Sequence, residues 1–271
     1  MLRREIPPVA GGCRGLITLG SMISCETIGG PHQQVSEEAL DDLVGRKLGE
    51  VPLDGKKVTL VIPDGTRSCP LPLLLRTLHR HLIGRAGELT AIIALGTHSY
   101  MEPDEIARMV GGDPGEIYPG MPILNHEWAD PDQLIQVGTI PASRIDELSE
   151  GRMHKDAPIR INRHVVEADY ALVVGPVFPH EVVGISGGNK YFIPGTASEE
   201  FIDMTHWVGA LITSYKIIGT TGITPVRAMI NEGAALIPAT RLALCLVVQS
   251  GSGEIEAASL GTSEDAWAAA A

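Results

Sequence analysis

Short apolar runs alternate with segments of helical pattern along much of this chain, and no other sequence feature limits its fold as much. Residues 58–63 read as a buried strand, and residues 71–83 follow with leucines at helical spacing. A second strand is predicted over 89–95 and a second helix over 103–110, which stops at Gly111-Gly112. This alternation favours a mostly parallel sheet with helices on both faces, a Rossmann-like α/β fold.

The remaining segments divide the chain into three predicted parts. Residues 1–50 form a preamble packed on the main domain, with a helix from Ser36 to Lys47. Residues 51–261 form the α/β domain. Within it, 113–150 is a long excursion rich in Pro, Gly, Asp and Asn, with one strand over 134–140. Residues 262–271 begin a helix too short to be stable alone, so we expect it to lead toward a second, C-terminal domain absent from this chain.

Three more strands and one helix complete the predicted domain. A strand over 170–175 leads into the glycine-rich stretch 184–195, and Ser198 begins a helix with Glu199 and Glu200 in its first turn. Strands over 242–248 and 255–259, separated by Ser-Gly-Ser-Gly, are typical of a closing pair.

Composition excludes several classes of function. With 21 basic and 33 acidic residues the net charge is −12, which disfavours nucleic acid and anionic membranes as partners. The apolar runs are shorter than the roughly 20 residues that span a bilayer. Residues 1–8 lack the apolar stretch of a secretory signal, so we expect a cytoplasmic protein. The four cysteines include no Cys-x-x-Cys pair, which disfavours a zinc site or a disulfide framework.

Polar residues follow three of the predicted strands. The first is followed by Asp64-Gly-Thr-Arg67, the second by Gly96-Thr-His98 and the third by Phe178-Pro-His180. Taken singly, Asp64 could form a turn, Arg67 could lie on the surface, and a histidine at a strand end is more often structural. Open α/β sheets bind ligands beyond the carboxyl ends of their strands, so three such coincidences favour one functional rim.

The glycine-rich stretch invites comparison with the phosphate-binding loop Gly-x-x-x-x-Gly-Lys-Ser/Thr, because Gly184 and Lys190 have the required spacing. Asn189 replaces the second glycine and Tyr191 replaces the hydroxyl residue, so the comparison fails. We expect Gly187-Gly188 instead to let the backbone approach a flat ligand and to place Lys190 in the cleft.

His206 lies about two turns into the helix that begins at Ser198. On its own it is more easily explained as a partly buried helix histidine, although neutral imidazole is a good nickel ligand.

Together these residues resemble the family of nickel-dependent lactate racemases. The resemblance covers most of residues 58–260. It is carried by Asp64-x-Thr66-Arg67-x-x-Pro70, by His98, by His180-x-x-x-Gly184-x-Ser-Gly-Gly-x-Lys190-x-x-x-Pro194-Gly195, and by His206. The third motif is the most specific, with ten residues from His180 to Lys190 and a further sixteen to His206.

The resemblance implies an unusual cofactor, the nickel-pincer nucleotide. This is a pyridinium mononucleotide whose thioamide and thiocarboxylate arms hold nickel together with a ring carbon. Lys190 would be its covalent tether and His206 would complete the nickel coordination. The resemblance places Arg67 as the clamp for the substrate carboxylate. The other cofactor-binding residues it implies are Asp64, Thr66, Gly187, Gly188 and Pro194.

The implied function is an isomerase that racemises or epimerises a lactate-like 2-hydroxy acid by reversible hydride transfer. His98 and His180 would be the acid/base pair, each titrating near neutrality. The implied partners are the small 2-hydroxy acid and the proteins that make the cofactor. Two alternatives stay open: the same chemistry on a sugar acid or another hydroxy acid, and a non-catalytic homologue that binds nickel or nucleotide.

The sequence also departs from the family. Family chains continue into a second domain that closes the cleft, so we expect this chain alone to be inactive. The stretch after Gly222, Ile-Thr-Pro-Val-Arg-Ala-Met, replaces a polar Asn/His-containing one, which leaves the identity of the hydroxy acid open. The oligomeric state is not indicated.

Overall fold

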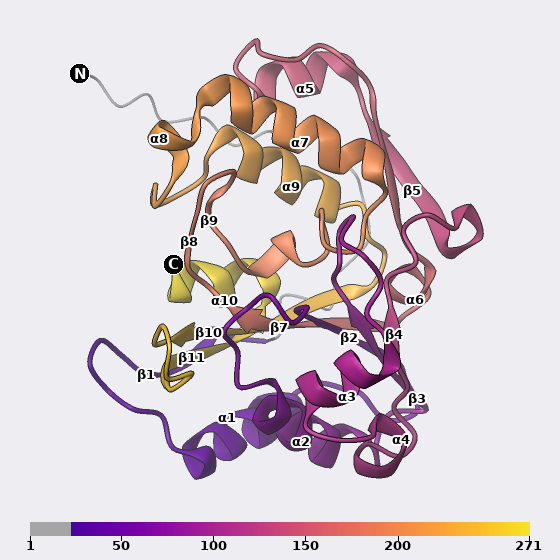
Figure 1. The fold of residues 1–271 in the computed structure, drawn as a ribbon, viewed down its shortest axis with the longest axis vertical. Coiled ribbons are helices and arrows are strands. Elements are labelled where there is room, and N and C mark those ends of the chain that lie inside the picture. Colours follow the sequence, from indigo (N-terminus) through magenta and orange to yellow (C-terminus); the bar gives the residue numbers. More distant parts are fainter. Residues whose placement is uncertain (1–22) are drawn as a thin grey trace.

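A seven-stranded sheet crosses the middle of the molecule (Figure 1) in the order β1-β11-β10-β7-β2-β3-β4. The computed structural model describes residues 23–271, so the start of the predicted preamble, residues 1–8 and Cys13 lie outside the described residues. The strands are β1 (Glu26–Gly29), β2 (Lys57–Ile62), β3 (Glu88–Ile93), β4 (Ile123–Asn125), β7 (Tyr170–Pro176), β10 (Thr240–Val248) and β11 (Ile255–Thr262).

The five strands from β10 to β4 run parallel, and the edge formed by β11 and β1 is antiparallel. The predicted α/β class with a mostly parallel sheet is therefore confirmed. The predicted closing strands also pair as expected, with Leu242 opposite Thr262. The carboxyl ends of β2, β3 and β7 lie side by side because these three strands are neighbours in the sheet.

Helices cover both faces of the sheet (Figure 1). On one side lie α1 (Glu37–Gly49), α2 (Leu71–Leu82), α3 (Pro103–Val110) and α4 (Pro114–Ile117). On the other lie α5 (Ala142–Leu148), α6 (Arg163–Val166), α7 (Glu199–Ile212), α8 (Ser214–Ile217), α9 (Pro225–Ala234) and α10 (Ser263–Ala270).

Strand β2 shows why its sequence reads as an apolar run. Leu60 and Ile62 join the hydrophobic core under α1 to α3, and Val61 joins the core on the opposite face. A strand covered on both faces needs apolar residues at every position rather than at alternate ones.

Some elements have no clear sequence pattern. The predicted excursion 113–150 contains β4, which pairs in parallel with β3 at the sheet edge. It also contains β5 (Leu134–Ile140), as predicted, which pairs with the unpredicted β6 (Ala157–Asn162) in a separate two-stranded sheet. Helix α9 is likewise unpredicted. Helix α10 lies within the predicted range 262–271; the Thr262 hydroxyl caps it by accepting from the Asp265 amide, and its Trp267 is buried.

Within residues 23–271, no helix combines the length and the apolar character needed to cross a membrane.

Candidate active site

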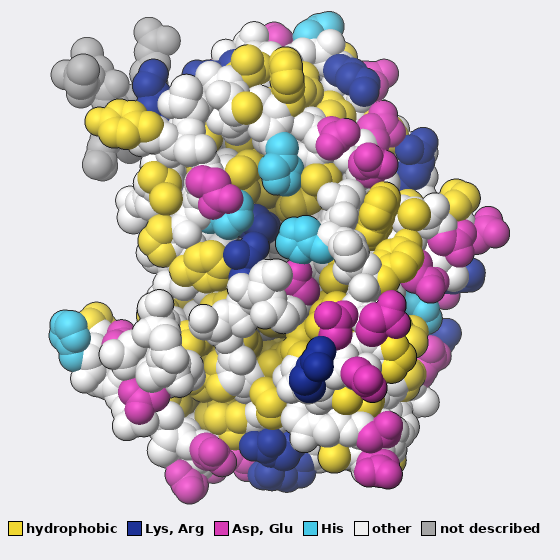
Figure 2. Space-filling view, viewed as in Figure 1, with side chains coloured by type: hydrophobic (Ala, Val, Ile, Leu, Met, Phe, Trp, Pro, Cys, Tyr) yellow, Lys and Arg dark blue, Asp and Glu magenta, His cyan; other side chains and the backbone are white. Residues whose placement is uncertain are grey.

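The three predicted strand ends meet at one cavity of about 490 Å³. Asp64 follows β2, His98 follows β3, and His180 lies in β8 (Pro179–His180) after β7. Helix α7 brings His206 to the same cavity. In Figure 2, histidine and Lys/Arg side chains gather in a hollow near the middle of the face shown. The residues predicted from sequence that line it are Asp64, Arg67, His98, His180, Gly187, Lys190, Pro194 and His206.

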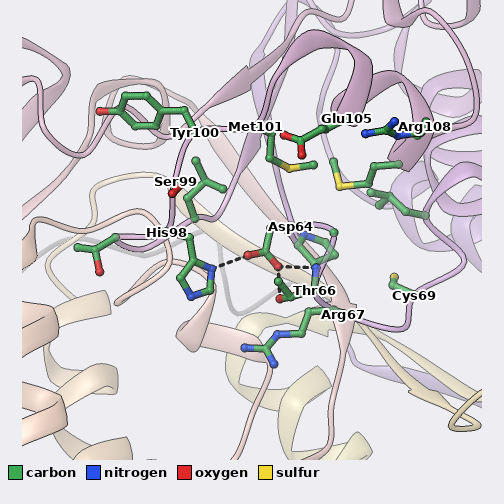
Figure 3. A pocket seen from close by; sticks show the side chains of 16 residues that line it. Asp64, Thr66, Arg67, Cys69, His98, Ser99, Tyr100, Met101, Glu105 and Arg108 are labelled. Carbon is green, nitrogen blue, oxygen red and sulfur yellow. Dashed lines mark hydrogen bonds and ion pairs between the residues drawn. The ribbon is translucent and has the colours of Figure 1, made fainter.

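Asp64 orients His98 (Figure 3). The Nδ1–H of His98 donates to Oδ2 of Asp64 at 2.6 Å, while the Thr66 hydroxyl donates to Oδ1 at 2.5 Å. Burial raises the pKa of Asp64, but the hydrogen bonds from Thr66 and His98 outweigh it, so the pKa lies below its usual value. An ionised carboxylate at Nδ1 leaves the lone pair of Nε2 available, which is the form of histidine that accepts a proton.

His180 has the opposite arrangement. Its side chain is 7% exposed, and its Nδ1 accepts a hydrogen bond from the Val182 amide at 3.1 Å. Neutral His180 therefore carries its proton on Nε2. Burial, followed by the charge of Lys190, lowers its pKa to about 3. The expectation that both histidines titrate near neutrality is therefore wrong for His180.

Lys190 ends a short 3₁₀ turn, η3 (Gly188–Lys190), and faces the cavity. Burial, followed by the charges of Arg67 and Arg227, lowers the pKa of its ammonium to about 8. Among the described residues no carboxylate lies within ion-pair distance of its Nζ. An amine with this pKa is appreciably neutral near physiological pH, and the neutral form is the nucleophile.

Gly187 and Gly188 are each constrained by the protein's own backbone and packing. Gly187 has φ +82°, and a Cβ there would lie 2.5 Å from Val177. Gly188 has φ +55°, and a Cβ there would lie 2.7 Å from the Cβ of Trp267. Gly187 borders the cavity, whereas Gly188 packs away from it. Backbone conformation and internal packing explain both glycines.

One ring nitrogen of His206 is engaged by the backbone of its own helix and the other is free. Its Nδ1–H donates to the Ile202 carbonyl one turn earlier in α7, at 2.7 Å, which leaves the Nε2 lone pair free. Metal-binding histidines commonly hold their second nitrogen in this way. Within residues 23–271 no three His, Cys, Asp or Glu side chains come together as a metal site.

Arg67 brings a guanidinium group to the cavity. Its guanidinium carbon lies 5.3 Å from the centre of the Phe178 ring, and no carboxylate of the described residues forms an ion pair with it. Planar guanidinium groups bind carboxylates through two parallel hydrogen bonds. The sequence did not predict a role for Phe178 beside Arg67, although its position two residues before His180 already placed it at the same strand end.

A second cavity of about 940 Å³, whose lining side chains are drawn in Figure 3, adjoins the first. Asp64, Arg67 and His98 border both cavities. Thr66, which sequence reasoning placed beside the cofactor, lines this second cavity and not the first. Its other lining side chains mix apolar and polar groups, among them Leu71, Ser99, Tyr100, Met101, Glu105, Arg108 and Met109.

Part of this sequence is similar to proteins that are already known. Residues 29–217 match the family model for the lactate racemase N-terminal domain. The lactate racemase of Thermoanaerobacterium thermosaccharolyticum is 27% identical over 201 residues, which cover 72% of this chain and 43% of that protein. The lactate racemase of Lactiplantibacillus plantarum is 27% identical over 190 residues, 68% of this chain and 40% of that protein.

Two solved structures resemble the fold. A crystal structure of a protein from Thermotoga maritima superposes with a TM-score of 0.78 at 31% identity, covering 90% of this chain and 58% of that one. The lactate racemase apoprotein from T. thermosaccharolyticum gives a TM-score of 0.69 at 24% identity, covering 86% and 54%. This chain thus spans less than half the length of the curated relatives. Because the family model covers well over half of the chain, the chain belongs to the lactate racemase family and corresponds to its N-terminal domain.

Proposed function

We propose that this chain provides the cofactor-binding and proton-transfer half of a racemase or epimerase of 2-hydroxy acids. The observation that carries the proposal is that Lys190, His206, Arg67, His98 and His180 border one cavity, although they come from four separate segments of the chain. Membership of the lactate racemase family supports racemase activity in general.

The residues fit a nickel-pincer nucleotide. Lys190 offers an amine of lowered pKa that could form the thioamide tether, and His206 offers a free Nε2 to the nickel. A single protein ligand suits a metal that a bound organic group already holds, and no three-ligand protein cluster exists among residues 23–271. When bound, such a cofactor supplies a reversible hydride acceptor. The proteins that make it would be transient partners of this chain.

Arg67 would fix the substrate carboxylate. The Phe178 ring under its guanidinium limits the directions in which the fork can turn. A carboxylate held there would keep the adjacent carbon and its hydroxyl inside the cavity that His98 also borders. Orientation of this kind converts binding energy into rate.

His98 would take the hydroxyl proton at Nε2, because Asp64 holds Nδ1–H. Neutral His180 instead presents Nε2–H, and it becomes a base only if Nδ1 releases the Val182 amide. The Glu181 carboxylate, 3.6 Å from Nδ1, is an acceptor that would favour that tautomer. Attachment of the Lys190 nitrogen as a thioamide would remove its charge, which is the second cause of the low pKa of His180. The two histidines would therefore become more alike once Lys190 is modified.

The second cavity favours one alternative, a hydroxy acid larger than lactate. Its volume of about 940 Å³ far exceeds what a methyl group needs, and Thr66, Ser99 and Tyr100 offer hydroxyl groups to a polar tail such as that of a sugar acid. Activity on long hydroxy acids but not on lactate would identify this alternative, and a panel of enantiomers followed by polarimetry measures both.

Intact mass tests the cofactor. Co-expression with the cofactor-making proteins should add a covalent adduct that Lys190→Ala removes and Lys216→Ala, an exposed control, retains. Absence of any adduct on the wild-type protein would refute the tether.

Isotope retention tests the reaction. Hydride transfer within the site keeps an α-deuterium on the substrate during inversion, whereas its loss to water would indicate a carbanion mechanism instead. An adduct without turnover on any hydroxy acid would favour the non-catalytic binding homologue.

A further inference from the structure

Three successive backbone carbonyls just before Lys190 each accept a hydrogen bond from a buried side chain. The Arg227 guanidinium, from α9, donates to the Ile185 carbonyl and, at 3.0 Å, to the Gly187 carbonyl. The Trp267 Nε1–H, from α10, donates to the Ser186 carbonyl between them at 2.7 Å. Elements at least 40 residues away in sequence thus fix the backbone that leads to the lysine.

Arg227 is an unusual residue for such a place. Its side chain is 1% exposed, and no carboxylate of the described residues forms an ion pair with it. The guanidinium carbon lies 4.3 Å from the centre of the Trp267 ring, and its Nε has no hydrogen-bond partner among the described residues. Burial of a charge without a counterion is expensive, so carbonyl dipoles and an aromatic face are its main compensation.

The residue next to Lys190 is held by the same two helices. The Asn189 amide donates to Asn231 of α9 at 3.1 Å and to Glu264 of α10 at 2.9 Å. Its carbonyl oxygen accepts from the Ser263 hydroxyl at 2.7 Å. Gly188 lies against Trp267 with no room for a Cβ. The whole segment 185–189 is therefore anchored from one side.

We propose that Arg227 and Trp267 form a positioning clamp that holds the 185–190 segment in shape, directs the Lys190 amine into the cavity and keeps it reactive. Both residues lie beyond the segment 29–217 that matches the family model. The inference rests on the proposed role of Lys190 as a tether. Arg227 is the third cause, after burial and Arg67, of the lowered pKa of Lys190, which agrees with a cation close behind this segment.

Competitive acetylation with trace acetic anhydride tests the clamp on the protein prepared without cofactor. Peptide mass spectrometry measures the extent of Lys190 acetylation at each pH, with the exposed Lys155 and Lys216 as internal references. In Arg227→Met the midpoint for Lys190 should rise by about half a pH unit, a roughly threefold slower reaction below the midpoint. The matched control Arg163→Met, which removes an exposed arginine, should leave it unchanged. An unshifted midpoint in folded Arg227→Met would overturn the electrostatic part of the proposal.

Amide hydrogen exchange tests the positional part. Trp267→Phe keeps a ring beneath Arg227 but loses the donor to Ser186, and Arg227→Lys keeps the charge but loses the fork. In both variants the backbone amides of residues 186–191 should exchange several-fold faster than in Arg163→Met. In Arg227→Lys the pH midpoint of Lys190 acetylation should stay at its wild-type value. Wild-type exchange rates in both variants would overturn the clamp even if Arg227→Met does not fold. Acetylation measures the free Lys190 amine and does not depend on the cofactor. A negative result in these experiments would therefore refute the clamp but not the tether, which the intact mass of the co-expressed protein tests separately.

Discussion

Asp64→Asn is the sharpest test of how this site prepares a base. The ionised carboxylate accepts from His98 Nδ1 at 2.6 Å and thereby fixes the proton on that nitrogen. Thr66 donates to the other oxygen of Asp64 through both its amide and its hydroxyl, so the carbonyl oxygen of the substituted side chain should stay with Thr66. The new NH₂ group then donates to Nδ1, and His98 must carry its proton on Nε2.

The expected magnitudes follow from burial and exposure. Asp64 is 7% exposed, but the His98 side chain is 58% exposed, so solvent screening reduces the lost charge-assisted bond to about 1 kcal/mol. That loss lowers Tm by about 3 °C in a domain of this size. Because the pKa of Asp64 is lowered in the fold, its stabilisation is present above the unfolded pKa of ~3.9 and is lost as pH falls through the folded value. In cofactor-loaded protein that racemises the hydroxy acid, loss of the base should reduce the rate by roughly 10² to 10⁴.

Nitrogen-15 shifts of the histidine ring read the tautomer directly. Wild type should show Nδ1–H for His98, and Asp64→Asn should show Nε2–H. Asp203→Asn, an exposed carboxylate that borders the same cavity, is the matched control and should keep the wild-type tautomer and Tm. If Asp64→Asn retains Nδ1–H, the orienting role of Asp64 is wrong; if the tautomer changes and racemisation persists, His98 is not the base.

Three further outcomes are expected. Arg67→Lys loses the planar fork and should raise KM for the hydroxy acid about tenfold with a smaller change in kcat; an unchanged KM would exclude Arg67 as the carboxylate clamp. Gly188→Ala should destabilise the fold by about 2–4 kcal/mol in chemical denaturation, because φ is +55° and Trp267 fills the space, and a near-neutral effect would contradict that packing. His126 is fully buried, and burial lowers its pKa to about 4. The unfolded chain takes up the proton first as pH falls from ~6.5 to 4, so the free energy of unfolding should drop by roughly 3 kcal/mol over that range. Denaturant unfolding at several pH values measures this, and His126→Gln should remove the dependence.

The strands and the site were predictable where one physical pattern dominates. An apolar run such as that of β2 is buried on both faces and has no competing explanation. The polar residues after β2, β3 and β7 meet because those strands are neighbours and parallel. Strand β4 is three residues long and half-buried at an edge, so its sequence carries little signal. Helix α9 begins at Pro225, directly after its cap Thr224, and this start signal was overlooked in the sequence.

The sequence by itself determined the alternation of strands and helices, the polar strand ends and the motif that leads to Lys190, because each depends on neighbours along the chain. Only the tertiary structure decided the state of the side chains. His98 and His180 look equivalent in sequence, yet a carboxylate that follows another strand fixes one, while a backbone amide and burial fix the other in the opposite tautomer. The carbonyls before Lys190 are likewise held by Arg227 and Trp267, since a hydrogen bond depends on distance in space and not in sequence.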